Sequence, residues 1–217
     1  MFENNVNWSY QVTGLQPSAY GRSSARYFVR TRGPGDLEQE HMRSREVGYN
    51  GFFPDLGLNL DAKLFHDEIT GMISEPLRNN QYIASNANTA RFQGGEAQLD
   101  WRVTTADRLR LTYAYVDTQA SSPLDEQLTA RHSGSAGWLR DWGHGWSSAL
   151  FYYGADALNG YRFERVDTRI AKRLLLGKTS LELAGMLQQR LDPQPTTYAD
   201  NNYDSRHVVY FSAELTF

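Results

Sequence analysis

The feature that most constrains this chain is a series of long segments in which apolar and polar residues alternate one by one. Side chains of a β-strand point alternately to opposite faces, so a period of two predicts strands with one apolar and one polar face. The stretch LNLDAKL shows the pattern: Leu58, Leu60 and Leu64 fall on one face, and Asn59 and Asp61 on the other. The alternation predicts nine strands, at residues 42–53, 58–70, 89–103, 107–119, 128–140, 145–155, 162–173, 179–190 and 206–217.

The length of these segments favours a membrane. Most span about 11 to 15 residues, whereas strands of globular proteins average about 5–6. A tilted strand that crosses a bilayer needs about 9–11 residues.

The connections between the segments alternate between short and long. Outer-membrane barrels have short periplasmic turns and longer external loops, and a soluble β-sandwich has no reason to keep this order. We therefore predict an all-β fold, an antiparallel transmembrane β-barrel segment of about nine to ten strands, with a soluble all-β domain as the alternative. The short connections are 54–57, 104–106, 141–144 and 174–178, and the long ones are 71–88, 120–127, 156–161 and 191–205.

The polar faces of the predicted strands carry charges of both signs. This composition suits a wet barrel lumen with cross-strand ion pairs, or equally the solvated face of a sheet. The charged and amide residues are Asn59, Asp61, Lys63, Glu96, Gln98, Asp100, Arg102, Arg108, Arg110, Arg165, Asp167, Arg169, Arg173, Glu182, Gln188 and Arg190.

The composition excludes several classes of protein. The net charge of −3 and pI of about 6.0 give no basic surface for nucleic acid. The mean hydropathy is −0.60, and no apolar run approaches the roughly 18 residues of a membrane-spanning helix. Cysteine is absent, so no disulfide or thiolate metal site is expected. The start, MFENNVNWSY, lacks the basic and apolar regions of a secretion signal.

Residues 1–41 do not follow the strand pattern. The stretches GRSS and TRGPGD have loop composition, although residues 22–30 have the alternation of one further strand. We expect an external loop or incomplete strand over 1–41 and the C-terminal barrel region over 42–217.

The segment GDLEQEHMRSREVGYNG, residues 35–51, resembles a sequence common in TonB-dependent outer-membrane receptors. Those receptors carry Leu-x-Pro-Glu, five residues and then Glu-x-Gly-Tyr at the entry to a barrel strand; here Gln39 replaces the proline. The stretch LDAKLFHDEITGMIS resembles the next strand, and YRFERVDTRIAKRL a late one. The matching positions of the first motif are Leu37, Glu40, Glu46, Gly48 and Tyr49.

The resemblance implies part of a barrel of about 22 strands that imports a scarce nutrient, expected to be an iron-siderophore complex, across the outer membrane of a Gram-negative bacterium. It implies outer-membrane lipid, the barrel-assembly machinery and an iron chelate as partners. Phe211, Leu215 and Phe217 would present the C-terminal assembly signal. The chain shows no plug or TonB-contact box, so we expect TonB to act only through an N-terminal part that this chain lacks.

No residue pattern indicates catalysis or a cofactor. The five histidines are scattered without metal-ligand spacing, so we expect no metal site. His132 and Ser133 are neighbours in a predicted strand, so they point to opposite faces and cannot form a catalytic dyad with each other. We expect no enzyme.

The long connection 191–205 is the expected ligand contact. It would lie outside the cell before the last strand, and its tyrosines and asparagines suit an oxygen-rich organic chelate. The residues are Tyr198, Asn201, Asn202 and Tyr203.

The alternative to a segment of a nutrient receptor is a small independent outer-membrane barrel, acting as a passive pore or a lipid-modifying enzyme. A tenth strand over 22–30 would support this alternative.

Overall fold

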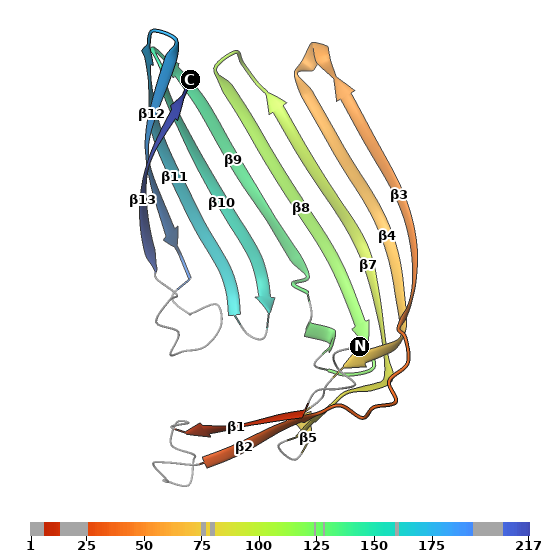
Figure 1. Cartoon of the computed structure of the whole chain (residues 1–217). Coiled ribbons are helices and arrows are strands. Elements are labelled where there is room, and N and C mark those ends of the chain that lie inside the picture. The colour runs from red at the N-terminus through yellow and green to blue at the C-terminus, as the bar shows by residue number, and fades with distance from the viewer. Residues whose placement is uncertain are drawn as a thin grey trace. The chain divides into compact units, whose positions relative to one another are not determined.

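In the computed structural model of the chain, nine long strands form one sheet in the order β13-β12-β11-β10-β9-β8-β7-β4-β3 (Figure 1). The structure describes residues 7–13, 26–74, 77–78, 81–123, 125–127, 129–158, 161–192 and 206–217. The nine strands are β3 (His41–Phe53), β4 (Leu58–Ser74), β7 (Ser85–Arg102), β8 (Asp107–Ala120), β9 (His132–Gly143), β10 (Trp146–Leu158), β11 (Tyr161–Leu176), β12 (Thr179–Arg190) and β13 (His207–Thr216).

All nine predicted strands are confirmed, and the differences concern where they begin and end. Shifts of four residues occur at the end of β4, at the start of β7 and at the start of β9, which begins at His132 rather than at residue 128. The short 3-10 helix Asp125–Gln127 lies in the connection before β9. Backbone hydrogen bonding between β8 and β9 starts where the amide of Val116 donates to the carbonyl of Arg131. A second 3-10 helix, Pro54–Leu56, forms the connection between β3 and β4.

The turn between β9 and β10 lies later than predicted. The residues expected to turn, 141–144, mostly belong to β9, and the turn itself is His144 and Gly145, with φ of 52° and 76°. Positive φ at both central residues is the signature of a two-residue hairpin whose twist matches that of its strands. A Cβ at position 145 would overlap the carbonyl oxygen of Arg173, so this turn requires glycine.

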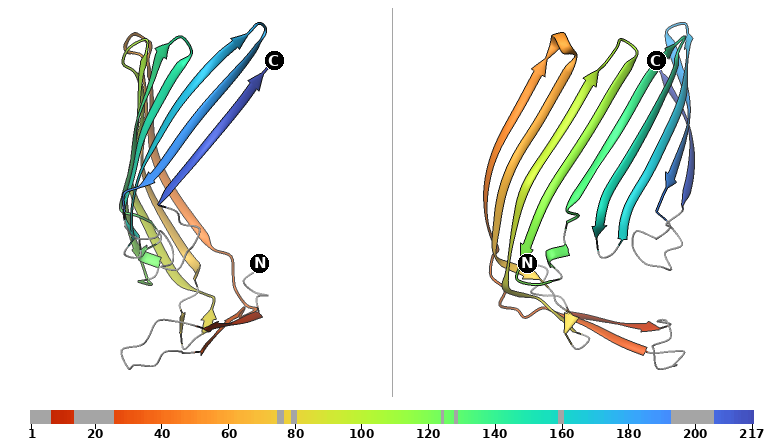
Figure 2. Two further views of the ribbon diagram at one scale, coloured as in Figure 1. Left: turned by 90° about the vertical axis from the view of Figure 1, so that its left-hand side faces the viewer. Right: turned by 180° about the vertical axis from the view of Figure 1, so that it is seen from behind.

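The short turns and the C-terminal end of β13 lie at the same end of the sheet (Figure 1). We call this the turn end. The order of strands places β3 and β13 at opposite edges, as the two further views also show (Figure 2).

Four shorter strands form a separate sheet in the order β1-β2-β6-β5. The described part of the segment 22–30, which begins at residue 26, does not supply a tenth strand to the large sheet, because β2 pairs with β1 and with β6. The four strands are β1 (Asn7–Thr13), β2 (Arg26–Arg32), β5 (Leu77–Arg78) and β6 (Gln81–Ile83).

The chain divides into two compact units. The small unit contains the four-stranded sheet and the ends of β3, β4, β7 and β8 that lie farthest from the short turns; the large unit contains the rest of the nine-stranded sheet. The small unit comprises Met1–Arg45, Asp67–Phe92 and Thr118–Leu128, and the large unit Glu46–His66, Gln93–Asp117 and Thr129–Phe217.

Within the small unit, the predicted loop 71–88 is largely strand, which corrects the sequence-based boundary. Side-chain hydrogen bonds hold this segment to its neighbours. The Asn86 amide donates to the carbonyls of Glu38 and Gly71 at 3.0 and 2.7 Å and accepts from the Glu38 amide at 2.7 Å. Polar residues of this segment are held in strands by these bonds. Polar composition by itself is typical of a loop, so the sequence predicted a loop here.

Candidate functional site: the two faces of the nine-stranded sheet

The nine-stranded sheet keeps its apolar side chains on the surface. Among the described residues, the buried hydrophobic ones are Leu37, Ala84, Ala90 and Ala171, which is no core for a domain of this size. Large apolar side chains such as Leu111 and Ile170 are 43% and 60% exposed. No helix among the described residues has the length and apolarity to cross a membrane.

Register places the predicted apolar residues of neighbouring strands on one common face, which we call the apolar face. Leu181 lies opposite Leu215, and Leu109 lies opposite Trp138. The opposite side is the polar face, where for example Thr112 lies opposite Ser135. The face assignment made from the alternation is therefore consistent from strand to strand.

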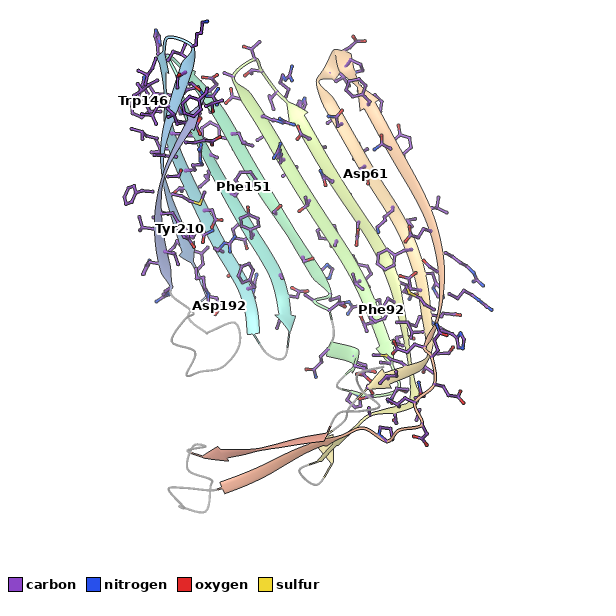
Figure 3. The ribbon with its side chains drawn as sticks, in the orientation of Figure 1. Asp61, Phe92, Trp146, Phe151, Asp192 and Tyr210 are labelled. Carbon is purple, nitrogen blue, oxygen red and sulfur yellow. The ribbon has the colours of Figure 1, made fainter. Side chains whose placement is uncertain are left out.

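Tryptophans gather on the apolar face near the turn end and bond through their indole nitrogens. Trp138 donates to Asp107 Oδ1 at 2.9 Å, and Trp142 donates to Ser148 Oγ at 2.8 Å. Trp146 also lies near this end (Figure 3). Rings that are apolar on one side and hydrogen-bonded at the other are typical of a membrane interface. We call this row the tryptophan girdle.

Tyrosines form a second row on the apolar face, farther from the turns. The hydroxyl of Tyr113 lies 2.7 Å from His132 Nδ1, and the hydroxyl of Tyr152 donates to Glu164 at 2.9 Å. We call this row the tyrosine girdle. Tyr153, its neighbour in sequence, lies on the polar face opposite Arg165, outside this girdle.

The separation of the two girdles matches a bilayer. Trp142 and His132 lie about ten residues apart on β9, which is about 33 Å along a strand and about 25 Å across a membrane at the usual barrel tilt. The apolar band of outer-membrane barrels is about 25 Å tall. The apolar face therefore has the dimensions of a lipid-facing surface.

The polar face carries ion pairs in which one carboxylate lies between two arginines. Asp100 accepts from Arg108 Nη2 at 2.6 Å and from Arg110 Nε at 3.0 Å. Strands β11 and β12 repeat the arrangement, where Glu182 accepts from Arg169 at 2.6 Å and from Arg173 at 3.1 Å. The arginine side chains are 33–61% exposed, so this face is wet and its pairs are partly solvated.

A hollow of about 530 Å³ lies in the large unit, lined by residues of β4 and of β7 to β11. The hydroxyls of Thr112 and Ser135 lie 2.8 Å apart at its wall, and the Arg165 guanidinium lies 4.8 Å from the ring of Tyr153. The hollow thus offers carboxylates, hydroxyls and ring faces to a ligand. Its polar-face lining includes Asp61, Glu96, Gln98, Thr112, Ser133, Ser135, Tyr153 and Phe163.

His132 and Ser133 point to opposite faces, as predicted. His132 bonds with Tyr113 in the tyrosine girdle, while Ser133 lines the hollow. No group of three His, Asp or Glu residues in the described part of the chain is arranged to hold a metal ion.

The small unit has its own polar hollow, of about 480 Å³. Its lining includes Thr70 of β4, Thr89 and Arg91 of β7 and Gln119 of β8. Arg91 lies 3.7 Å from Glu68, which also lines it.

The motif residues Leu37 and Glu40 serve the strand that follows them. Leu37 is buried, and Glu40 Oε1 accepts a hydrogen bond from the amide of Ile73 at 2.6 Å. These contacts fasten the entry segment to β4 within the small unit.

The predicted assembly residues lie on the apolar face at the edge strand β13. Phe211 is 85% exposed, Leu215 48% and Phe217, which directly follows β13, 93%. The predicted ligand residues Tyr198, Asn201, Asn202 and Tyr203 lie outside the described residues.

An antiparallel sheet with one lipid-sized apolar band, two aromatic girdles and a charged polar face defines a wall of an outer-membrane-type β-barrel. A family model described as TonB dependent receptor-like, beta-barrel, matches residues 5–213. The chain therefore belongs to the TonB-dependent receptor β-barrel family, whose members are outer-membrane receptors and transporters of Gram-negative bacteria. A search of curated proteins found no match.

Sequence reasoning missed the residues that depend on cross-strand pairing. The bonds of Tyr113 with His132 and of Trp138 with Asp107 join residues 19 and 31 positions apart. Each of these residues lies in a predicted strand, but only the register between strands could pair them.

Proposed function

We propose that this chain is the barrel portion of an outer-membrane receptor for TonB-energised uptake of a scarce nutrient, an iron-siderophore complex. The observation that carries the proposal is the polar face of the nine-stranded sheet. The chain that forms this sheet matches the receptor family over residues 5–213. Its hollow combines hydroxyls, carboxylates and aromatic rings, which suit an organic chelate rich in oxygen.

The edges of the sheet support a larger barrel. In the described residues, β3 and β13 each have a strand partner on one side only. An open edge inside a bilayer leaves backbone N–H and C=O groups unsatisfied, at several kcal/mol for each group. We propose that both edges pair with further strands to complete a barrel of about 22 strands.

The start of the large sheet at His41 supports the proposed division of the chain, while the four-stranded sheet also takes β5 and β6 from the region 42–217. Residues 1–41 contain β1 and β2, which belong to the four-stranded sheet, while the first strand of the large sheet begins at His41. We assign 1–41 to an external segment and 42–217 to the C-terminal barrel region.

The partners follow from the two faces. The apolar face contacts outer-membrane lipid, and exposed Phe211, Leu215 and Phe217 on the edge of the sheet present a signal to the barrel-assembly machinery. TonB is proposed to act through the N-terminal part of the receptor.

The external connection before β13 is the proposed first contact for the ligand. Tyr198 and Tyr203 offer ring faces and hydroxyls, and Asn201 and Asn202 offer donors and acceptors. The test is binding of ferric siderophores to the full-length receptor with Tyr198→Ala and Tyr203→Ala combined.

We expect at least a tenfold loss of affinity, about 1.4 kcal/mol, if the two rings contact the ligand. A matched variant, Tyr152→Ala in the lipid-facing tyrosine girdle, controls for general loss of tyrosine. Unchanged affinity with normal surface display would remove this loop from the site. Failure of every iron chelate to bind the unmodified receptor, with uptake of another nutrient, would overturn the siderophore assignment.

A further inference from the structure

The apolar face is hollowed between β10 and β13 by a groove of about 920 Å³. Its walls are apolar side chains: Ile170 of β11, Leu183 and Leu187 of β12, and Val209 and Phe211 of β13. Such a groove has the size and polarity to hold a hydrocarbon chain.

Glycine keeps the groove open. Gly185 lies opposite both Ile170 and Phe211 in the ladder, between Leu183 and Leu187 on its own strand. A Cβ at this position would lie 3.6 Å from the Phe211 ring, so a larger side chain would occupy the space beside that ring.

A lysine and a tryptophan lie at the end of the groove nearest the turns. Lys172 and Trp146 are register partners, and Lys172 Nζ lies 5.0 Å from the Trp146 ring. The ammonium donates to the carbonyl of His144 at 2.7 Å. An ammonium has three donors, so this single bond leaves two for a ligand.

Lys172 differs from Arg140, whose guanidinium lies 4.5 Å from the Trp142 ring of the tryptophan girdle. Arg140 is paired with the carboxylate of Asp107 at 3.2 Å. Within the described residues, Lys172 has no carboxylate at ion-pairing distance. A half-buried cation on a lipid-facing surface favours an anion from the membrane as its partner.

We infer that this groove is a binding site for one anionic glycerophospholipid of the membrane leaflet at the turn end. One acyl chain lies over Gly185 between the walls from β11, β12 and β13. The phosphate accepts hydrogen bonds from Lys172, beside the Trp146 ring. An anionic headgroup is favoured over a zwitterionic one because it brings no ammonium of its own to compete with Lys172.

The inference rests on the membrane placement of the receptor and is independent of its nutrient. The full-length protein is purified from outer membranes in a mild detergent, and heat-modifiability confirms the folded barrel of each variant. Native mass spectrometry then measures binding of phosphatidylglycerol and of phosphatidylcholine with the same acyl chains.

The unmodified protein should bind phosphatidylglycerol several-fold more tightly than phosphatidylcholine. Lys172→Gln should weaken phosphatidylglycerol binding about fivefold, the effect of one cation near an anionic headgroup, and Lys172→Arg should retain it. Lys178→Gln removes the same charge in the neighbouring turn, outside the groove, and should change nothing. Gly185→Leu should weaken both lipids alike by filling the groove.

Equal binding of the two lipids by the unmodified protein would overturn the inference, whatever the variants do. So would equal losses from Lys172→Gln and Lys178→Gln, or full binding after Gly185→Leu. A protein that binds no ferric siderophore but keeps the lipid preference would refute the proposed nutrient and leave this site intact.

Discussion

An arginine at Leu111 should reveal whether the apolar face contacts lipid. Leu111 lies opposite Ala136 on β9, close to the midpoint between the two girdles. On the same scale it is about 10 Å from the level of His132 and about 15 Å from the level of Trp142. An arginine side chain reaches about 7 Å, so its guanidinium cannot escape the hydrocarbon without distorting the bilayer.

The expected loss of unfolding free energy follows from the depth of Leu111 in the bilayer. An arginine at the midplane of an outer-membrane barrel costs about 2–4 kcal/mol, and we expect that loss of unfolding free energy for Leu111→Arg. The matched variant is Thr112→Arg, one residue along the strand. Thr112 lies on the polar face beside a hollow that also contains Asp61 and Glu96, so its arginine reaches water and carboxylates. Thr112→Arg should cost less than about 1 kcal/mol.

The assay is reversible unfolding of the full-length protein in guanidinium chloride in the presence of lipid vesicles, followed by tryptophan fluorescence. Leu183→Arg and Ala184→Arg repeat the comparison on β12, where Leu183 is 44% exposed on the apolar face. Equal losses within both pairs would refute the assignment of the two faces. A larger loss for Thr112→Arg and Ala184→Arg would reverse it.

The remaining predictions concern assembly, the ion pairs and a turn. Deleting Phe217 or replacing it with Asp should sharply reduce outer-membrane insertion in a heat-modifiability gel, whereas Thr216→Ala should not; equal insertion would argue against the assembly signal. Asp100→Asn leaves two arginines without their shared carboxylate and should lower the unfolding free energy by about 1 kcal/mol, less at high salt. Asp55→Asn, in an exposed turn, should have no such effect, and a salt-independent loss would contradict the pairing. Gly145→Ala should cost at least about 1–2 kcal/mol in denaturant unfolding because of its φ of 76° and its close approach to Arg173; a neutral result would show that the turn differs.

The sequence alone predicted the sheet well because strands of this kind are encoded locally. Alternation with a period of two fixes which residues share a face, and segment length distinguishes a bilayer-crossing strand from a short one. The residues of LNLDAKL and of the last strand, from Val209 to Leu215, needed no knowledge of their neighbours to be assigned.

Predictions made from composition were less accurate. Residues 71–88 have the composition of a loop but contain strands. Side-chain hydrogen bonds of Glu40 to the Ile73 amide and of Asn86 to the Gly71 carbonyl, which join residues distant in the sequence, hold these strands in place. The turn after β9 lies at His144 and Gly145, later than predicted, because the hairpin needs two residues with positive φ. Several neighbouring residues also have turn composition, so the sequence did not locate the turn to the residue.

Tertiary structure decided which side chains meet. Tyr113 contacts His132, and Lys172 contacts Trp146, only because hairpin geometry sets the register between strands. A slip of one residue would place every partner on the other face, so no single strand carries this information. The sequence by itself therefore determined the strands and their two faces, while the register determined the girdles, the ion pairs and the groove over Gly185, because each of these is built from residues on different strands.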